Sequence, residues 1–336
     1  MLTVIIPTHE RRDLVLRLLE ALGRQRIEAG AFDVVVVVDG ATDDTAEALR
    51  SAHWPFALRV IEQPRGGPGA ARNRGAADAS GELLVFLDDD IVPGAEFLER
   101  MRAALEDGAD LVLPVTRVAD WVPDGLLARE QRSWVEHGIR TAAAGALTMH
   151  DVHFAATGVR RRCFREAGGF DASLTAGDLW GKEDAELGFR LLRSGCRVVF
   201  RADIVVEMDC VTDPRIALRR ARALGRGDAW LARKHPEMAS QLFRAALREA
   251  RIQRAMGHVV LAAPWSLALL WPLRRMLIAA VRRAWAGALM YRFWLVVWSA
   301  EWWRGVIDAG GRALARRELL GQAQRASTAR MRASHS

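Results

Sequence analysis

Short apolar runs alternate with amphipathic stretches through the first 90 residues of the chain. Residues 34–38 are five consecutive valines, which is typical of a parallel strand buried on both faces. The alternation predicts an α/β fold with a mostly parallel sheet and helices on both faces. The expected strands are residues 4–7, 34–38, 58–61 and 83–87, and the expected helices are residues 11–24, 46–51 and 70–79.

The pattern changes twice further along the chain. A glycine- and acid-rich segment begins at residue 168 and leads into an expected helix over residues 185–194 and a strand over 196–200. After about residue 211 the sequence becomes rich in arginine, with an expected helix over residues 215–254. We therefore expect an α/β domain at residues 1–210 and an α-helical region at residues 211–336.

The helical region differs from the α/β part in charge. Residues 1–200 carry 24 Lys/Arg against 31 Asp/Glu, whereas residues 201–336 carry 24 against 10. Seven of the 12 tryptophans lie between Trp265 and Trp303, and tryptophan with arginine is typical of a membrane–water interface. A helical subdomain packed on the α/β domain and a dimer interface are the alternatives. No nucleic-acid-binding motif accompanies the charge, so nucleic acid is not an expected partner.

Transmembrane, secretory and disulfide-rich classes receive little support. Residues 257–273 are uncharged, but two prolines interrupt them and a helix needs about 20 residues to span a bilayer. The apolar run after Met1 is too short for a secretory signal. The three cysteines lack C-x-x-C spacing, which argues against a disulfide framework and a structural zinc site. We expect a cytoplasmic protein attached peripherally to the cytoplasmic face of the membrane.

Three consecutive aspartates, Asp88, Asp89 and Asp90, follow the apolar run 83–87. Chemistry in open α/β sheets gathers at the carboxyl ends of strands. Adjacent carboxylates repel one another, and a divalent cation with oxygen ligands relieves that repulsion. The triplet therefore indicates either a metal site or a solvated turn.

A glycine-rich turn at residues 66–69 resembles a dinucleotide-binding fingerprint, but Arg72 stands where the third glycine is needed. The turn also follows the third expected strand instead of the first. What remains is a helix start with free backbone N–H groups and arginines, which suits an anionic ligand such as a diphosphate. A tight turn with solvent-facing arginines is the alternative.

Taken together, the motifs resemble the family-2 inverting glycosyltransferases of the GT-A fold. The resemblance covers about residues 1–210 and depends on the order of its motifs. These are Ile6-Pro7-Thr8-His9-Glu10-Arg11, Val38-Asp39-Gly40, Gly69-Ala70-Ala71-Arg72-Asn73, Phe86-Leu87-Asp88-Asp89-Asp90, Gly169-Phe170-Asp171 and Glu183-Asp184-Ala185-Glu186.

The resemblance implies a role for each matching residue. Thr8 and Asp39 would hold the nucleobase and ribose, and His9 would stack on the base. Asp90 would bind Mg²⁺ or Mn²⁺ with support from Asp88, and Asp184, next to Glu183, would be the general base. The implied donor-binding residues are Pro7, Thr8, His9, Arg11, Asp39, Arg72, Asp88 and Asp89, and the acceptor-side residues are Trp180 and Gly181.

One position departs from the family pattern. Many members have a histidine metal ligand after the strand that follows the Glu-Asp helix, and here Met208 stands at about that position. A thioether is a poor ligand for a hard cation. Asp209 or Glu207 supplies an oxygen instead, or the aspartates, the diphosphate and water hold the metal alone. His150 and His153 are further possible substitutes.

The function implied is inverting transfer of a sugar from a nucleotide-diphosphate sugar, UDP-linked by resemblance, to a hydroxyl acceptor. A lipid-linked or glycan acceptor would explain the basic, tryptophan-rich region, and a natural-product acceptor is the other possibility. The alternatives are a sugar nucleotidyltransferase and a non-catalytic nucleotide-sugar-binding protein. Nucleotidyltransferases carry a glycine-rich loop after the first strand, and residues 7–11 contain no glycine.

Overall fold

The computed structural model describes residues 1–28, 30–143, 145, 147–149, 151–174, 182–248, 257, 259–263, 265–266, 271–282 and 287–317. The chain divides into two compact units. The first comprises residues 1–124, 128–177 and 183–210, and the second comprises residues 125–127, 178–182 and 211–336. The main division therefore follows residue 210, close to where the composition changes.

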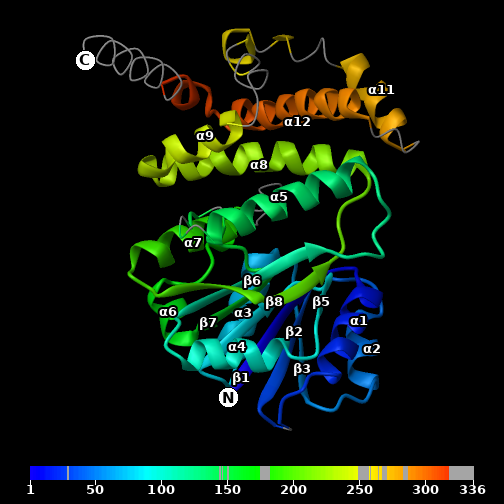
Figure 1. The fold of residues 1–336 in the computed structure, drawn as a ribbon, viewed down its shortest axis with the longest axis vertical. Helices are drawn as coiled ribbons and strands as arrows, with labels where there is room; N and C mark the ends of the chain where they lie inside the picture. Colours follow the sequence, from blue (N-terminus) through cyan, green and yellow to red (C-terminus); the bar gives the residue numbers. More distant parts are fainter. Residues whose placement is uncertain are drawn as a thin grey trace. The chain divides into compact units, whose positions relative to one another are not determined.

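An eight-stranded sheet forms the centre of the first unit, in the order β3-β2-β1-β4-β7-β6-β8-β5 (Figure 1). The pairs β1–β2, β1–β4, β2–β3 and β6–β8 are parallel, whereas β7 runs antiparallel to β4 and β6, and β5 runs antiparallel to β8. The expected α/β sheet is confirmed. The strands are β1 (Leu2–Thr8), β2 (Phe32–Asp39), β3 (Ala57–Gln63), β4 (Leu83–Leu87), β5 (Ile91–Pro93), β6 (Leu111–Val118), β7 (Ala156–Arg160) and β8 (Val198–Met208).

Helices cover both faces of this sheet because the central strands are apolar on both sides. Val34 and Val36 of β2 belong to the core cluster that includes side chains of α1, α2 and α4, whereas Val35 and Val37 pack with Ala71 of α3. The helices of the first unit are α1 (Arg12–Gly23), α2 (Thr45–Ser51), α3 (Pro68–Asp78), α4 (Phe97–Glu106), α6 (Arg161–Glu166) and α7 (Glu183–Arg193), with most of α5 (Leu126–Ala143).

The register of the parallel strands determines where polar residues gather. Thr8 at the end of β1 pairs with Val38, one residue before Asp39, and Ile5 pairs with Phe86, two residues before Asp88. The carboxyl ends of β1, β2 and β4 therefore lie at one edge of the sheet. This edge is where the sequence predicts the chemistry.

Two expected elements differ from the structure. The strand expected over residues 196–200 is β8, Val198–Met208, which is longer because it pairs with both β6 and β5. The single helix expected over residues 215–254 is wrong. Helix α8 ends at Lys234, and Pro236 starts a short 3₁₀ turn before α9 (Ala239–Arg248), because proline cannot donate to the preceding helical turn.

The second unit is helical and includes α8 (Pro214–Lys234), α9, α11 (Trp271–Arg282) and α12 (Ala288–Asp308). Helices α8 and α12 approach closely at two glycines. A Cβ atom at Gly225 would lie 2.0 Å from the Trp302 carbonyl oxygen, and one at Gly305 would lie 2.0 Å from the Arg222 carbonyl oxygen. Only glycine fits at either position, so these residues determine how the two helices pack.

Several tryptophans of the basic region form the core of the second unit. Trp294, Trp302 and Trp303 are buried, and Trp302 Nε1 donates a 2.9 Å hydrogen bond to the buried Asp228 carboxylate. Trp265, in contrast, is 70% exposed. Among the described residues, no helix combines the length and apolar character required to cross a bilayer. Part of the tryptophan content thus serves helix packing.

Candidate active site

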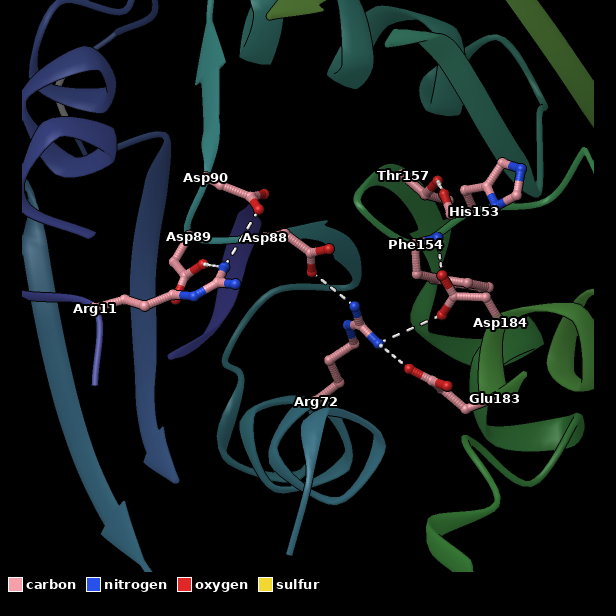
Figure 2. Close-up of polar contacts among 10 residues, drawn as sticks. All are labelled: Arg11, Arg72, Asp88, Asp89, Asp90, His153, Phe154, Thr157, Glu183 and Asp184. Carbon is pink, nitrogen blue, oxygen red and sulfur yellow. Dashed lines mark hydrogen bonds and ion pairs between the residues drawn. The ribbon is translucent and has the colours of Figure 1, made fainter. Parts of the chain in front are cut away.

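Five carboxylates and two arginines converge at the edge of the sheet where β1, β2 and β4 end (Figure 2). Asp88, Asp89 and Asp90 follow β4, while Glu183 and Asp184 form the first turn of α7. Arg11 and Arg72 lie among them. Motifs that are far apart in the sequence thus meet in one cluster.

Asp89 is the buried member of the aspartate triplet. Its side chain is 6% exposed, compared with 31% for Asp88 and 23% for Asp90. Thr8 Oγ1 donates to Asp89 Oδ2 at 2.9 Å, and Arg11 Nη1 donates to Asp89 Oδ1 at 2.8 Å. Burial raises the pKa of Asp89, and Arg11 and Thr8 oppose that rise. Asp89 therefore ties β4 to β1, and the other two carboxylates remain closer to solvent.

Asp39 fixes the glycine-rich turn at the start of α3. Its Oδ1 accepts hydrogen bonds of 2.8 Å from Gln63 Nε2 and from the Gly66 N–H, and its Oδ2 accepts one of 2.8 Å from the Gly67 N–H. Gly67 has φ +85°, a conformation that favours glycine. The His9 ring lies beside the same residue, with Nδ1 2.8 Å from the Asp39 carbonyl oxygen. The predicted base-binding carboxylate thus also fixes the loop before α3.

Arg72 links the aspartate triplet to the Glu-Asp pair. Its side chain is 4% exposed, and Nη2 donates to Asp88 Oδ1 at 2.6 Å. On the other side, Nη1 donates to Glu183 Oε1 at 3.3 Å and to Asp184 Oδ1 at 3.4 Å (Figure 2). Burial alone would lower the pKa of Arg72, but the three carboxylates raise it above its ordinary value. The guanidinium therefore remains charged and neutralises part of the cluster.

The Glu183–Asp184 pair is held at the amino end of α7. Asp184 Oδ2 accepts a 3.0 Å hydrogen bond from the Phe154 N–H, so each of its oxygens has a donor. Burial raises the pKa of Asp184, and Arg72 opposes the rise. Burial, followed by the charge of Asp184, raises the pKa of Glu183 to about 7. The pair thus combines Glu183, a buried acid, with Asp184, a more exposed carboxylate held in a fixed orientation.

Met208 and Asp209 lie beside the aspartate triplet. Met208 pairs with Ile91, next to Asp90, and the Asp209 N–H donates to the Asp90 carbonyl oxygen at 3.2 Å. Trp121 Nε1 donates to Asp209 Oδ1 at 2.6 Å, and Arg17 forms an ion pair with Oδ2. Two donors, Trp121 and Arg17, therefore engage the Asp209 carboxylate, the possible further metal ligand.

The donor set suits a hard divalent cation. Asp88 and Asp90 offer carboxylate oxygens from the more exposed positions of the triplet, and Mg²⁺ and Mn²⁺ prefer such ligands. Arg11 Nη1 also donates to Asp90 Oδ2 at 3.2 Å, so part of the Asp90 charge is compensated in this structure. The residues present thus fit the metal that the sequence predicts.

An aromatic pair flanks the Asp184 side of the cluster. The ring centroids of Trp134, on α5, and His153 lie 4.8 Å apart at an interplanar angle of 61°. His153 directly precedes Phe154, whose N–H binds Asp184, and Trp134 is 47% exposed. This pair could not be predicted from the sequence, because tryptophan at helical spacing is usually a core residue. The predicted acceptor-side residues Trp180 and Gly181, and also His150, lie outside the described residues.

The comparison with protein families agrees with this geometry. The family description "Glycosyl transferase family 2" matches residues 3–168 of the chain. The chain belongs to this family. Its matched segment contains Asp39, Arg72 and the aspartate triplet, and Glu183–Asp184 lies beyond it.

Two curated relatives of this family-2 chain are named for different molecules. The pre-mycofactocin glycosyltransferase of Mycobacterium tuberculosis is 30% identical over 246 residues, which is 71% of this chain and 49% of that protein. The validoxylamine A glucosyltransferase of Streptomyces hygroscopicus is 28% identical over 271 residues, which is 72% of this chain and 63% of that protein. The chain thus spans less than two thirds of the length of either relative.

Solved structures show the same fold at low sequence identity. The mannosyltransferase PcManGT from Pyrobaculum calidifontis, bound to GDP-Man and Mn²⁺, has a TM-score of 0.64 and 23% identity, covering 92% of this chain and 86% of that one. TarS from S. aureus with UDP has a TM-score of 0.50 and 19% identity, covering 88% and 89%. The expected GT-A fold is confirmed.

Proposed function

We propose that this chain transfers a glycosyl group from a nucleotide-diphosphate sugar, UDP-linked, to an acceptor hydroxyl with inversion at the anomeric carbon. The observation that carries the proposal is the position of Arg72 between two carboxylate groups of different character. One group, Asp88 and Asp90, suits a metal-bound diphosphate. The other, Asp184 with Glu183, suits proton removal from an acceptor.

The chemistry requires one displacement. The acceptor oxygen attacks the anomeric carbon, the bond from that carbon to the diphosphate oxygen breaks, and the hydroxyl proton passes to Asp184. A bound Mg²⁺ or Mn²⁺ would stabilise the charge on the leaving diphosphate as a Lewis acid. Arg72 and the Phe154 N–H orient Asp184, with one donor on each carboxylate oxygen. A single base and a single leaving-group site support inversion.

A panel of nucleotide sugars tests the donor and the stereochemistry. The Tm of the purified chain is measured with each UDP-, GDP- and TDP-sugar, in the presence of Mn²⁺ and of chelator. The donor that raises the Tm most is then used for product analysis by NMR. Metal-dependent stabilisation by one donor, followed by a product of inverted anomeric configuration, is the expected result. A retained anomeric configuration would contradict the single displacement.

The Trp134–His153 pair, of which Trp134 is exposed, supports an acceptor that presents a ring, as in a glycan or a sugar-bearing natural product or lipid. Aromatic rings pack against the apolar face of a sugar, and Trp134 is 47% exposed next to the residues that hold Asp184. Replacement of Trp134 by alanine should raise the KM for the acceptor and leave the donor KM unchanged. Trp265→Ala is the matched control, because Trp265 is also exposed but belongs to the second unit.

We also propose that the second unit attaches to the cytoplasmic face of a membrane, where a lipid-linked acceptor would lie. Met276, Leu289 and Phe293 are 70%, 66% and 40% exposed on α11 and α12, and Arg275 and Arg292 are exposed beside them in the sequence. Exposed apolar side chains with arginines suit an anionic lipid surface. Flotation with phosphatidylglycerol vesicles, but not with phosphatidylcholine vesicles, is expected. Equal flotation of a Met276→Glu/Leu289→Glu variant would contradict this surface.

A further inference from the structure

Asp110, Cys163 and Cys196 bring three potential metal ligands together in the first unit. One carboxylate oxygen and the two Sγ atoms all lie within 4.8 Å of one another. They come from three elements: the residue before β6, helix α6 and the turn before β8. We propose that these residues bind one thiophilic divalent cation of the Zn²⁺ type, with two thiolates and one carboxylate as ligands.

This cluster lies at the sheet edge opposite the candidate active site. Arg160, next to α6, pairs with Leu83 at the start of β4, whereas Asp88 follows the end of the same strand. Asp110 precedes β6, which runs parallel to β4 because both are antiparallel to β7. The metal site is therefore separate from the proposed transfer reaction and does not depend on it.

The backbone holds the Asp110 carboxylate in place before any ion binds. The Asp110 N–H donates to the Arg197 carbonyl oxygen at 2.9 Å, and the Arg160 N–H donates to the Asp110 carbonyl oxygen at 2.9 Å. Asp110 Oδ2 also accepts a 3.0 Å hydrogen bond from the Arg197 N–H. Such outer contacts orient metal ligands and strengthen binding. Because Arg197 follows Cys196, the same contacts position the second thiol.

The geometry suits a metal better than a disulfide. A disulfide uses only the two sulfurs, whereas here a carboxylate oxygen converges with them. Zinc–thiolate bonds of about 2.3 Å place two sulfurs of a tetrahedral site roughly 3.7 Å apart, which small side-chain movements can provide. Water would take the fourth position of the ion, and Ser194 Oγ lies 3.1 Å from Cys196 Sγ beside it. On binding, both thiol protons pass to solvent.

The charges balance when the cation is present. Two thiolates and a carboxylate carry three negative charges, and a divalent cation leaves one. Arg160 Nε and Arg162 Nη2 lie 3.8 Å and 3.9 Å from Asp110 Oδ1, so guanidinium groups offset the remainder. Arg160 is itself fixed by a 3.0 Å hydrogen bond to the Ala109 carbonyl oxygen. Cys163 is buried, and the partly exposed Asp110 and Cys196 provide the entry route.

Cobalt substitution tests this site independently of any aspartate-bound metal. The chain of residues 1–336 is reduced, stripped with chelator and titrated with Co²⁺ and with Zn²⁺. A thiolate-to-cobalt absorption band that saturates at one ion per chain and disappears with Zn²⁺ is expected, because carboxylate sites give no such band. Cys196→Ser should abolish the band or weaken the affinity for Co²⁺ at least about 10-fold, and Asp110→Asn should also weaken the affinity for Co²⁺.

Cys210→Ser is the matched control and should behave as the wild type. If Cys163→Ser fails to fold, the Cys196→Ser and Asp110→Asn variants still decide the question, because both positions are partly exposed. The proposal is overturned by the absence of the band in the wild type or by an equal band in Cys196→Ser. The proposal would also be overturned if mass spectrometry found the chain lighter by two hydrogens, with a disulfide between Cys163 and Cys196 even in the presence of Zn²⁺.

Discussion

The backbone N–H of Phe154 donates a 3.0 Å hydrogen bond to Oδ2 of Asp184. This contact joins Phe154, two residues before β7, to the first turn of α7 and holds the Asp184 carboxylate in a fixed orientation. Because a general base must be within hydrogen-bond reach of the proton it removes, orientation is as important as pKa. The arrangement leads to four predictions about the active site.

Replacement of Asp184 by asparagine should lower the rate of transfer by about 10²–10⁴-fold, because the amide cannot accept the acceptor proton. The donor Kd should change only a few-fold, since the side chain keeps its size. Single-turnover transfer and donor titration measure the two effects. Asp203→Asn, an exposed substitution on β8, is the control. Turnover at the wild-type rate would exclude Asp184 as the base.

Arg72→Ala should destabilise the first unit as well as slow the reaction. Removal of the guanidinium leaves Asp88, Glu183 and Asp184 without a buried counter-charge, and loss of one partner from a buried pair costs about 3–5 kcal/mol. Arg72→Lys retains the charge but not the two-sided contact, so it should recover stability more than kcat. Chemical unfolding and steady-state kinetics separate the two. If Arg72→Lys recovered stability and kcat to the same extent, a positioning role for Arg72 would be contradicted.

Asp90→Ala and Asp89→Ala should affect different properties. Asp90 is the proposed metal ligand, so its removal should abolish the stabilisation that Mn²⁺ adds to donor binding. Asp89 is buried between Thr8 and Arg11, so its removal should lower the Tm without any ligand, by loss of two hydrogen bonds. Thermal shifts with and without Mn²⁺ and donor measure both. Undiminished Mn²⁺-dependent stabilisation of Asp90→Ala would contradict the metal assignment.

Glu183 should make the stability of the ligand-free chain depend on pH. Its pKa rises from 4.5 to about 7 on folding, so the folded state holds the proton more tightly than the unfolded state. The resulting stability, at most about 3 kcal/mol, is complete below pH 4.5 and is lost as pH rises to about 7. Glu183→Gln should remove this dependence in urea unfolding from pH 5 to 8. An unchanged pH profile would contradict it.

The sequence predicted the elements that depend on local pattern. The valine run of β2 is buried on both faces, and Glu183 and Asp184 begin a helix as expected. Asp89 is buried whereas Asp88 and Asp90 are more exposed, but Asp89 and Asp90 lie in the turn after β4, so alternation along a strand does not explain this difference. The helix break at Pro236 could also have been predicted from the local sequence, because proline ends a helix.

Contacts between distant segments could not be read from the sequence. The resemblance assigns Arg72 to donor binding, but its contacts with Asp88 and Glu183 depend on how α3 and α7 approach each other. One of the two donors to Asp184 is a backbone N–H, which no residue type reveals. Cys163 and Cys196 are 33 residues apart and meet Asp110 only because β6, α6 and β8 share one sheet edge. The spacing of the two cysteines along the sequence therefore does not indicate this cluster.

The three hydrogen bonds that Asp39 accepts also bear on the entropy of ligand binding. Because Gln63, Gly66 and Gly67 are already held, the loop before α3 should lose little backbone freedom when a nucleotide arrives. Ordering a residue costs about 1–2 kcal/mol, so a preorganised loop of this length retains several kcal/mol for affinity. Asp39→Ala would therefore weaken nucleotide binding through loop disorder even where the ligand never touches the carboxylate.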